Sequence, residues 1–137
     1  MEDMIKMLAD APQEQRIQMI TERLKMIAGQ PEPQRVESVK GLVLAISKLD
    51  DKKKAPFIAD RTNIIAKLEP EQKGAILVAR AKVGPQLPEN INKADLKYTV
   101  AAVKQWPEEN RNMFVQGLKK AFEAANVPMP DIDAMMN

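Results

Sequence analysis

The chain has 137 residues, of which 45% are hydrophobic and 29% charged, and its net charge is +2 at neutral pH. This length and composition are typical of one soluble globular domain with its own core. The chain contains neither cysteine nor histidine, which excludes Cys/His zinc sites, thiol nucleophiles and Ser–His or Cys–His catalytic pairs. No stretch approaches the ~18 consecutive apolar residues of a membrane span, and the N-terminus lacks the features of a secretory signal, so we expect a cytoplasmic protein.

The first predicted element is a short helix near the N-terminus, over residues 2–8. Met4, Met7 and Leu8 are spaced so that they share one helical face. Because three apolar residues on one face need a surface to pack against, we expect this helix to dock on the helices that follow it.

From residue 12 onward, the sequence repeats with a constant period. Six segments of 19 residues begin at Pro12, Pro31, Asp50, Glu69, Pro88 and Pro107. A fixed period is typical of helical arrays, and this length suits one helix of roughly four turns plus a tight connection. Proline and acidic residues, which open each segment, are favoured in the first turn of a helix. Asn126 then predicts the end of the sixth helix.

Apolar residues recur at fixed places within the segments. The ninth place holds Ile20, Val39, Ile58, Leu77, Leu96 and Val115. The sixteenth place, two turns further along the same face, holds Ile27, Ile46, Ile65, Gly84, Val103 and Phe122. This spacing predicts amphipathic helices. Because short connections favour antiparallel neighbours, we expect an all-α fold of six antiparallel helices, either a short α-solenoid or a compact bundle.

Two segments depart from the regular pattern at their starts. Pro56 lies well inside the third segment, which predicts that its helix begins near Ala55 and that residues 50–54 form a charged loop. In the fifth segment, the four residues from Asn92 resemble a capping box. This motif predicts a helix that begins near Lys93.

The strongest helix-breaking stretch covers residues 84–91, which contain Gly84-Pro85 and a second proline. It predicts a hinge within a single domain that spans residues 1–125. Residues 126–137 are expected to form a flexible tail.

Basic side chains occupy the fifth place of five segments: Arg16, Arg35, Lys54, Lys73 and Arg111. A cation in the first turn opposes the helix dipole, which indicates that another interaction favours it. One interpretation is a partner-binding rim, divided in an antiparallel array between alternate helices. The other is a solvated face with local pairs, since an acid precedes Arg35 and Arg111 by three residues.

The densest basic patch is the run Lys52–Lys54, with Lys48, Arg61 and Lys67 nearby. It could contact a phosphate backbone, but a nucleic-acid surface would need more such residues, with aromatic residues among them for stacking. The only aromatic residue nearby, Phe57, is predicted to belong to the core. The sequence has no glycine-rich phosphate loop, and its carboxylates follow helix starts rather than converge, so we expect no cofactor and no metal site.

Three phrases at the segment boundaries share one form: Leu68-x-Pro70-Glu71-x-Lys73, Leu87-Pro88-Glu89 and Trp106-Pro107-Glu108-Glu109-x-Arg111. This phrasing resembles the short-helix repeats of the magnesium-transporter cytosolic N-domain family, and related helical arrays occur in flagellar motor switch proteins. The resemblance implies a superhelical scaffold used for contacts between proteins. The chain departs from that family in its longer repeat and in lacking an acidic cation-binding surface, so no functional residues are transferred.

We therefore expect a non-enzymatic helical-repeat scaffold that mediates protein–protein interaction, with the five basic residues at the rim of the binding surface. Such an array can also associate with itself, because end helices that are not strongly polar allow stacking. The alternative is a nucleic-acid-associated protein that binds phosphate backbones through basic helix edges. Catalysis would need acids, bases or nucleophiles that converge on one site, which the sequence does not indicate.

Overall fold

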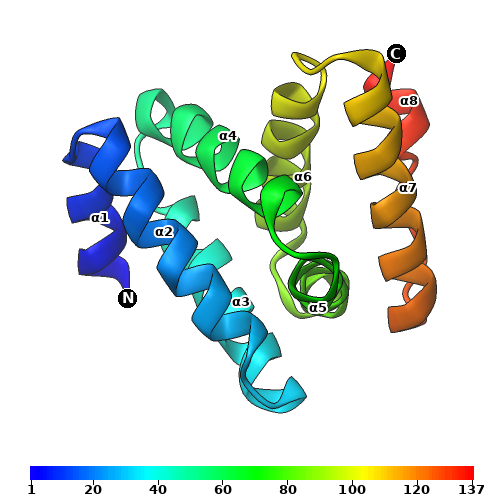
Figure 1. The fold of residues 1–137 in the computed structure, drawn as a ribbon, viewed down its shortest axis with the longest axis horizontal. Helices are drawn as coiled ribbons and strands as arrows, with labels where there is room; N and C mark the ends of the chain where they lie inside the picture. Colours follow the sequence, from blue (N-terminus) through cyan, green and yellow to red (C-terminus); the bar gives the residue numbers. More distant parts are fainter.

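A computed structural model describes all 137 residues and confirms an all-helical fold without strands (Figure 1). The chain forms the α-helices α1 (Glu2–Asp10), α2 (Gln13–Ala28), α3 (Glu32–Ser47), α4 (Asp51–Lys67), α5 (Pro70–Val83), α6 (Glu89–Val103), α7 (Glu108–Ala125) and α8 (Ile132–Met136), with a 3-10 turn, η1 (Gly84–Gln86), between α5 and α6. No helix combines the length and the apolar character needed to cross a membrane.

The six long helices α2 to α7 begin at the predicted segment boundaries. Their N-caps are Pro12, Pro31, Asp50, Glu69, Pro88 and Pro107. The φ angles of these caps lie between −60° and −53°, a range that the proline ring imposes by itself. Each helix also carries an acid in its first turn, which complements the helix dipole. The predicted stop at Asn126 is confirmed, since its φ of 57° is left-handed.

The predicted late start of the third long helix is wrong, because residues 50–54 begin α4 rather than form a loop. The carbonyl of Asp50 accepts hydrogen bonds from the backbone N–H groups of Lys53 and Lys54, both at 2.9 Å. Pro56 lies inside the helix and its ring is exposed. The helix therefore loses one backbone hydrogen bond there, while Lys53 forms an ion pair with Asp10 of α1.

The capping-box prediction is also wrong, because α6 begins at Glu89 rather than near Lys93. The two side chains that suggested the motif face another helix instead of their own N-terminus. Nη2 of Arg80, in α5, donates to Asn92 Oδ1 at 2.7 Å, and Nε donates to Asp95 Oδ2 at 2.9 Å. Asn92 and Asp95 therefore form hydrogen bonds with another helix instead of capping the N-terminus of their own.

The most extensive helix packing joins helices that are two apart in sequence. These pairs form two rows, α1–α3–α5–α7 and α2–α4–α6–α8, whereas consecutive helices contact each other over shorter stretches. Figure 1 shows α5 end-on between α3 and α7, while α7 runs from the top of the view to the bottom. The fold is a compact helical bundle in which most packing lies outside the hairpins that sequence alone suggested.

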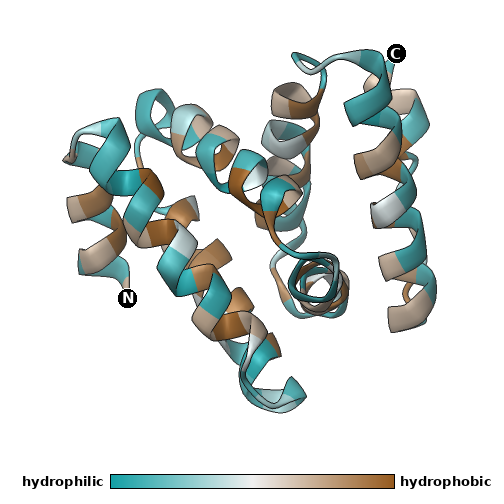
Figure 2. Cartoon of the chain, in the orientation of Figure 1, coloured by the Kyte–Doolittle hydropathy of each residue, from teal (hydrophilic) through white to brown (hydrophobic).

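The core follows the predicted periodicity closely. All six residues at the ninth place are buried, and so are five of the six at the sixteenth, Gly84 being the exception. In Figure 2 apolar and polar residues alternate along each helix, as helices with one buried face require. In α1 the buried residues are Ile5 and Leu8, whereas Met7 is 61% exposed. The docking face of α1 is therefore rotated from the predicted one.

The C-terminal segment differs from the predicted flexible tail in containing a short helix that folds back on the bundle. Ile132 of α8 is buried in a small cluster with Val100 of α6 and Val115 of α7. The Asp131 side chain accepts a hydrogen bond from the N–H of Ala134 at 3.0 Å. The segment is held against the bundle by the packing of Ile132 on these two valines, and its first turn is stabilised by the Asp131 cap.

Candidate functional site

The five basic residues predicted as a partner-binding rim lie in both rows of helices. Arg35, Lys73 and Arg111 belong to α3, α5 and α7, and Arg16 and Lys54 belong to α2 and α4. They do not gather into one cluster.

The three arginines in this set share an intramolecular role that the sequence did not reveal. Each guanidinium donates to the backbone carbonyl five residues before it: Arg16 to Ala11 at 3.2 Å, Arg35 to Gln30 at 2.8 Å and Arg111 to Trp106 at 3.1 Å. Those carbonyls belong to the connection that precedes each helix, where intrahelical partners are missing. The arginines therefore tie each connection to the helix that follows it.

The two lysines in the set behave differently from the arginines. Lys54 approaches Asp51 of its own helix at 3.6 Å, and its side chain is largely covered. Lys73 forms no ion pair and lines a surface hollow, described below. A lysine ends in a compact ammonium rather than a planar fork, which explains why it does not reproduce the arginine contact. Lys73 lies at the candidate binding site described below, whereas Arg111 lines a more polar hollow beside α8 and Lys54 a smaller one between α3, α4 and α6.

A buried ion cluster is the largest polar feature that the sequence analysis missed. Arg61 of α4 donates to Asp95 of α6 at 2.8 Å, and Arg80 of α5 donates to the other carboxylate oxygen at 2.9 Å. Arg61 also donates to Thr99 at 2.9 Å. Arg61 and Asp95 are 6% and 5% exposed. Two arginines on one carboxylate thus join three helices in the interior.

The charges of this cluster fix the ionisation of Asp95. Burial by itself would raise the pKa of Asp95, but the positive charges and hydrogen bonds of Arg61 and Arg80 outweigh it and hold that pKa below its ordinary value. Burial lowers the pKa of Arg80, yet a guanidinium begins so high that it stays charged. The cluster is therefore a fixed structural charge arrangement with no group poised for proton transfer.

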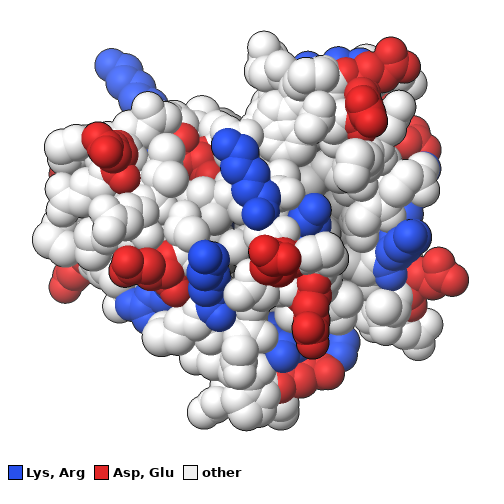
Figure 3. All heavy atoms as spheres, viewed as in Figure 1, with Lys and Arg blue, Asp and Glu red and all other residues white.

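The basic patch around Lys52–Lys54 is largely neutralised by other parts of the chain. Lys48 pairs with Glu2 at 3.1 Å, and Lys53 pairs with Asp10. The hydrogen bond and charge of Lys48 lower the pKa of Glu2. Arg61, which the sequence places in the same patch, is buried in the ion cluster. Figure 3 shows one face of the molecule on which acidic and basic side chains are interspersed.

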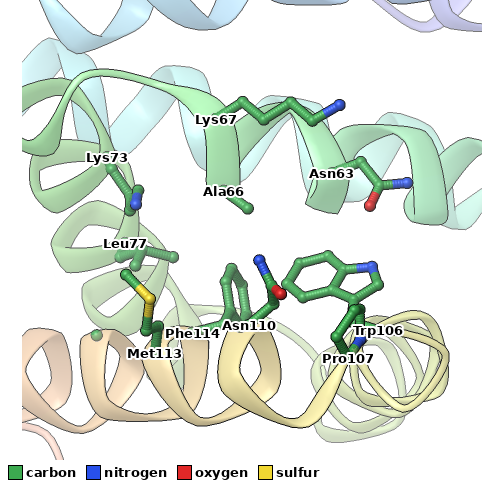
Figure 4. Close-up of a pocket in the computed structure, with 11 residues that line it drawn as sticks. Asn63, Ala66, Lys67, Lys73, Leu77, Trp106, Pro107, Asn110, Met113 and Phe114 are labelled. Atoms are coloured by element: carbon green, nitrogen blue, oxygen red, sulfur yellow. The ribbon is translucent and has the colours of Figure 1, made fainter.

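Helices α4, α5 and α7 surround an open hollow with a volume of about 350 Å³ (Figure 4). Its apolar walls come from Ala66 of α4, Leu77 of α5 and Phe114 of α7, with Trp106 at the side. The Trp106 ring meets Phe114 edge to face, with centroids 5.3 Å apart and planes at 85°. This contact packs the tryptophan at the junction of the last two long helices.

Polar and flexible side chains surround the apolar part of the hollow. The remaining lining residues are Asn63, Lys67, Lys73, Pro107, Asn110, Met113 and Gly117. Met113 is 65% exposed, and no carboxylate is among the lining residues. We call it the α4–α5–α7 hollow. Its apolar and aromatic residues are called the floor below, and its lysines and asparagine amides are called the rim. Sequence reasoning identified Lys73 as a candidate but had no signal that α4 would face it and Trp106.

No group of three or more acidic side chains lies close enough together to hold a metal ion. Comparison of the chain with known protein families, with curated proteins and with solved structures finds no match.

Proposed function

We propose that this protein is a non-enzymatic helical scaffold that binds another protein through the α4–α5–α7 hollow. The observation that carries the proposal is the lining of the hollow, in which the half-buried Trp106 and the exposed Met113 lie beside the buried Phe114 and are bordered by polar side chains. Aromatic residues and methionine are enriched at protein interfaces, where they supply rigid or adaptable apolar contact area. A cytoplasmic location stays a prediction from the sequence.

Binding fits the residues of the hollow better than catalysis does. Its polar groups are two lysines and two asparagine amides, and no carboxylate or hydroxyl lies among the lining residues. General acid–base or nucleophilic chemistry needs a group of tuned pKa within reach of an activating partner. Hydrogen-bonding amides around an apolar floor are instead suited to hold a ligand in place.

The alternative of nucleic-acid binding has less support. The basic patch that suggested it has Lys48 and Lys53 paired with acids, and Arg61 buried. Phosphate binding draws its free energy from unpaired cations that displace counterions. Cations already paired within the chain contribute little of that free energy.

The proposal is tested by placing a photo-crosslinking amino acid at Met113 and, as a control, at Met7, which is similarly exposed on α1. We expect one partner to be captured from position 113 only. That partner, once purified, should bind the wild-type chain at a fixed stoichiometry, and Ala66→Phe, which fills the hollow, should weaken binding more than ten-fold.

Two further variants make this result decisive. Ala101→Phe adds the same ring at an exposed position on α6 and should leave binding unchanged. Met113→Glu changes the rim at a side chain that the fold does not need, so it serves if Ala66→Phe disturbs folding. Binding that is unaffected by both hollow variants, in chains with wild-type circular dichroism, would disprove the assignment of this site.

A further inference from the structure

We infer that the segment bound in the α4–α5–α7 hollow is acidic as well as apolar. It would seat an aliphatic or aromatic side chain against Trp106 and Phe114 and direct adjacent Asp or Glu side chains to Lys67 and Lys73. The inference rests on the proposed function and specifies the chemistry of the partner.

The first argument is the uncompensated charge of the hollow. Neither Lys67 nor Lys73 forms an ion pair, although Glu69 and Glu71 lie between them in sequence. Other lysines are paired, as Lys82 is with Glu32 and Lys119 with Asp133, and several more are unpaired, but Lys67 and Lys73 are the two that line the hollow. Two free cations beside an apolar surface attract anions, because the low-dielectric wall strengthens their field.

The second argument is the position of these charges relative to the apolar floor. Figure 4 places Lys67 on the α4 side and Lys73 on the α5 side of the hollow, with Phe114 and Met113 on the opposite, α7 side. A side chain that enters between them would carry its own backbone and neighbouring residues past both lysines. A peptide with an apolar residue flanked by carboxylates could therefore pack on the apolar part of the hollow and pair with both lysines.

The third argument is the supply of hydrogen-bonding groups. The exposed amides of Asn63 and Asn110 border the hollow, and each amide offers both donors and acceptors. A bound peptide presents backbone N–H and C=O groups, which need partners of both kinds. The volume of about 350 Å³ lies in the range of roughly 300–1,000 Å³ typical of ligand pockets, so the hollow has room for a side chain of the partner.

The inference is tested by selecting a library of random displayed peptides on the full-length wild-type chain, with Ala66→Phe and Ala101→Phe as parallel baits. Peptides that bind the wild type and Ala101→Phe but not Ala66→Phe are those that depend on the hollow. We expect this set to combine an aliphatic or aromatic residue with two or more Asp or Glu and a net negative charge.

The strongest selected peptide is then measured against Lys67→Glu/Lys73→Glu. We expect this double reversal to weaken binding about ten-fold or more and to remove its salt dependence, since each exposed ion pair contributes several-fold. The control, Lys25→Glu/Lys97→Glu, makes the same change in net charge at exposed lysines outside the hollow and should bind as the wild type does.

The outcomes separate this inference from the proposed function. If no selected peptide depends on Ala66, the hollow does not bind peptides and the proposed function fails with it. If hollow-dependent peptides are neutral or basic, or resist the charge reversal, only the acidic chemistry is wrong. Displacement of the acidic peptide by a short oligothymidine at equal concentration would likewise overturn the inference in favour of a nucleic-acid ligand.

Discussion

Asp95 of α6 links three helices, because its carboxylate forms ion pairs with arginines of α4 and α5. Arg61 and Arg80 reach it from the two other helices, and Arg80 does so across the 3-10 turn where the sequence predicts a hinge. A buried ion pair is not strong evidence of net stability, because desolvation offsets much of the attraction. Its removal, however, leaves buried charges without a partner.

Asp95→Asn keeps the shape of the side chain but leaves Arg61 and Arg80 facing each other. We expect the free energy of unfolding to fall by about 3–5 kcal/mol, measured by urea unfolding at pH 7. Asp51→Asn removes a carboxylate that is 89% exposed in its pair with Lys54 and should change stability by less than about 1 kcal/mol. Equal effects of the two substitutions would show that the cluster has no special role.

The lowered pKa of Asp95 also predicts how stability depends on pH. Because the folded pKa lies below the unfolded value of about 3.9, the carboxylate stabilises the fold above roughly pH 5, and this contribution is lost as pH falls through the folded pKa. Urea midpoints between pH 7 and pH 2 should therefore fall further for the wild type than for Asp95→Asn. Parallel curves would contradict the lowered pKa, since all other acids are common to both chains.

At the scale of the elements, the 19-residue period places residues that stabilise the connections as well as residues that form the helices. Arg16, Arg35 and Arg111 each bond the carbonyl five residues earlier, whereas Lys54 and Lys73 do not. The same place in the segment therefore has two roles, and the residue type decides between them. Connections without an arginine rely on the buried leucines that precede the next helix, such as Leu49 and Leu68.

The irregular α4 offers a test of how local preference and tertiary packing balance. Pro56 is exposed inside the helix and cannot donate the usual hydrogen bond, so Pro56→Ala should raise the free energy of unfolding by about 1 kcal/mol or more. Pro33→Ala is the matched control, because Pro33 lies in the first turn of α3, where its N–H would have no partner. Chemical denaturation should show no gain for Pro33→Ala; a loss on Pro56→Ala would indicate that residues 51–55 depend on the proline.

At the scale of the whole molecule, the packing of the two rows of helices determines which side chains come together at the surface. The hollow forms where α4 of one row lies opposite α7 of the other, with α5 beside both. The same arrangement brings Glu2 and Asp10 of α1 to lysines near the start of α4. Packing of the rows thus creates an apolar basic site in one place and neutralises a basic patch in another.

This arrangement predicts weak interaction with nucleic acids. Random duplex DNA should bind the wild type no more tightly than about 10⁻⁴ M at physiological salt, the weak end of non-specific binding. Glu2→Gln/Asp10→Asn frees Lys48 and Lys53 and should increase retention on heparin at low salt. Tight binding of the wild-type chain that falls steeply with salt and is lost in Lys52→Ala would support the nucleic-acid alternative instead.

The sequence by itself determined the six long helices and their buried faces, but neither the docking face of α1 nor the short helix α8. The period places a helix-favouring proline or acid at each N-cap and an apolar residue at the ninth place. Both features act within one segment, so they do not depend on which helices become neighbours. It failed where a side chain had a distant partner. Asn92 and Asp95 looked like a local cap, and Pro56 looked like a helix start, because neither pattern contains information about α1 or α5.

Only the tertiary structure decided the rows, the ion cluster and the hollow. Lys73 was a candidate from its place in the segment, but Asn63, Ala66 and Lys67 come from a helix whose position no local pattern specifies. Arg61 was placed in a surface patch and is buried instead. The physical reason is that periodicity records which side of a helix avoids water, whereas the choice of neighbouring helix depends on how whole faces fit together.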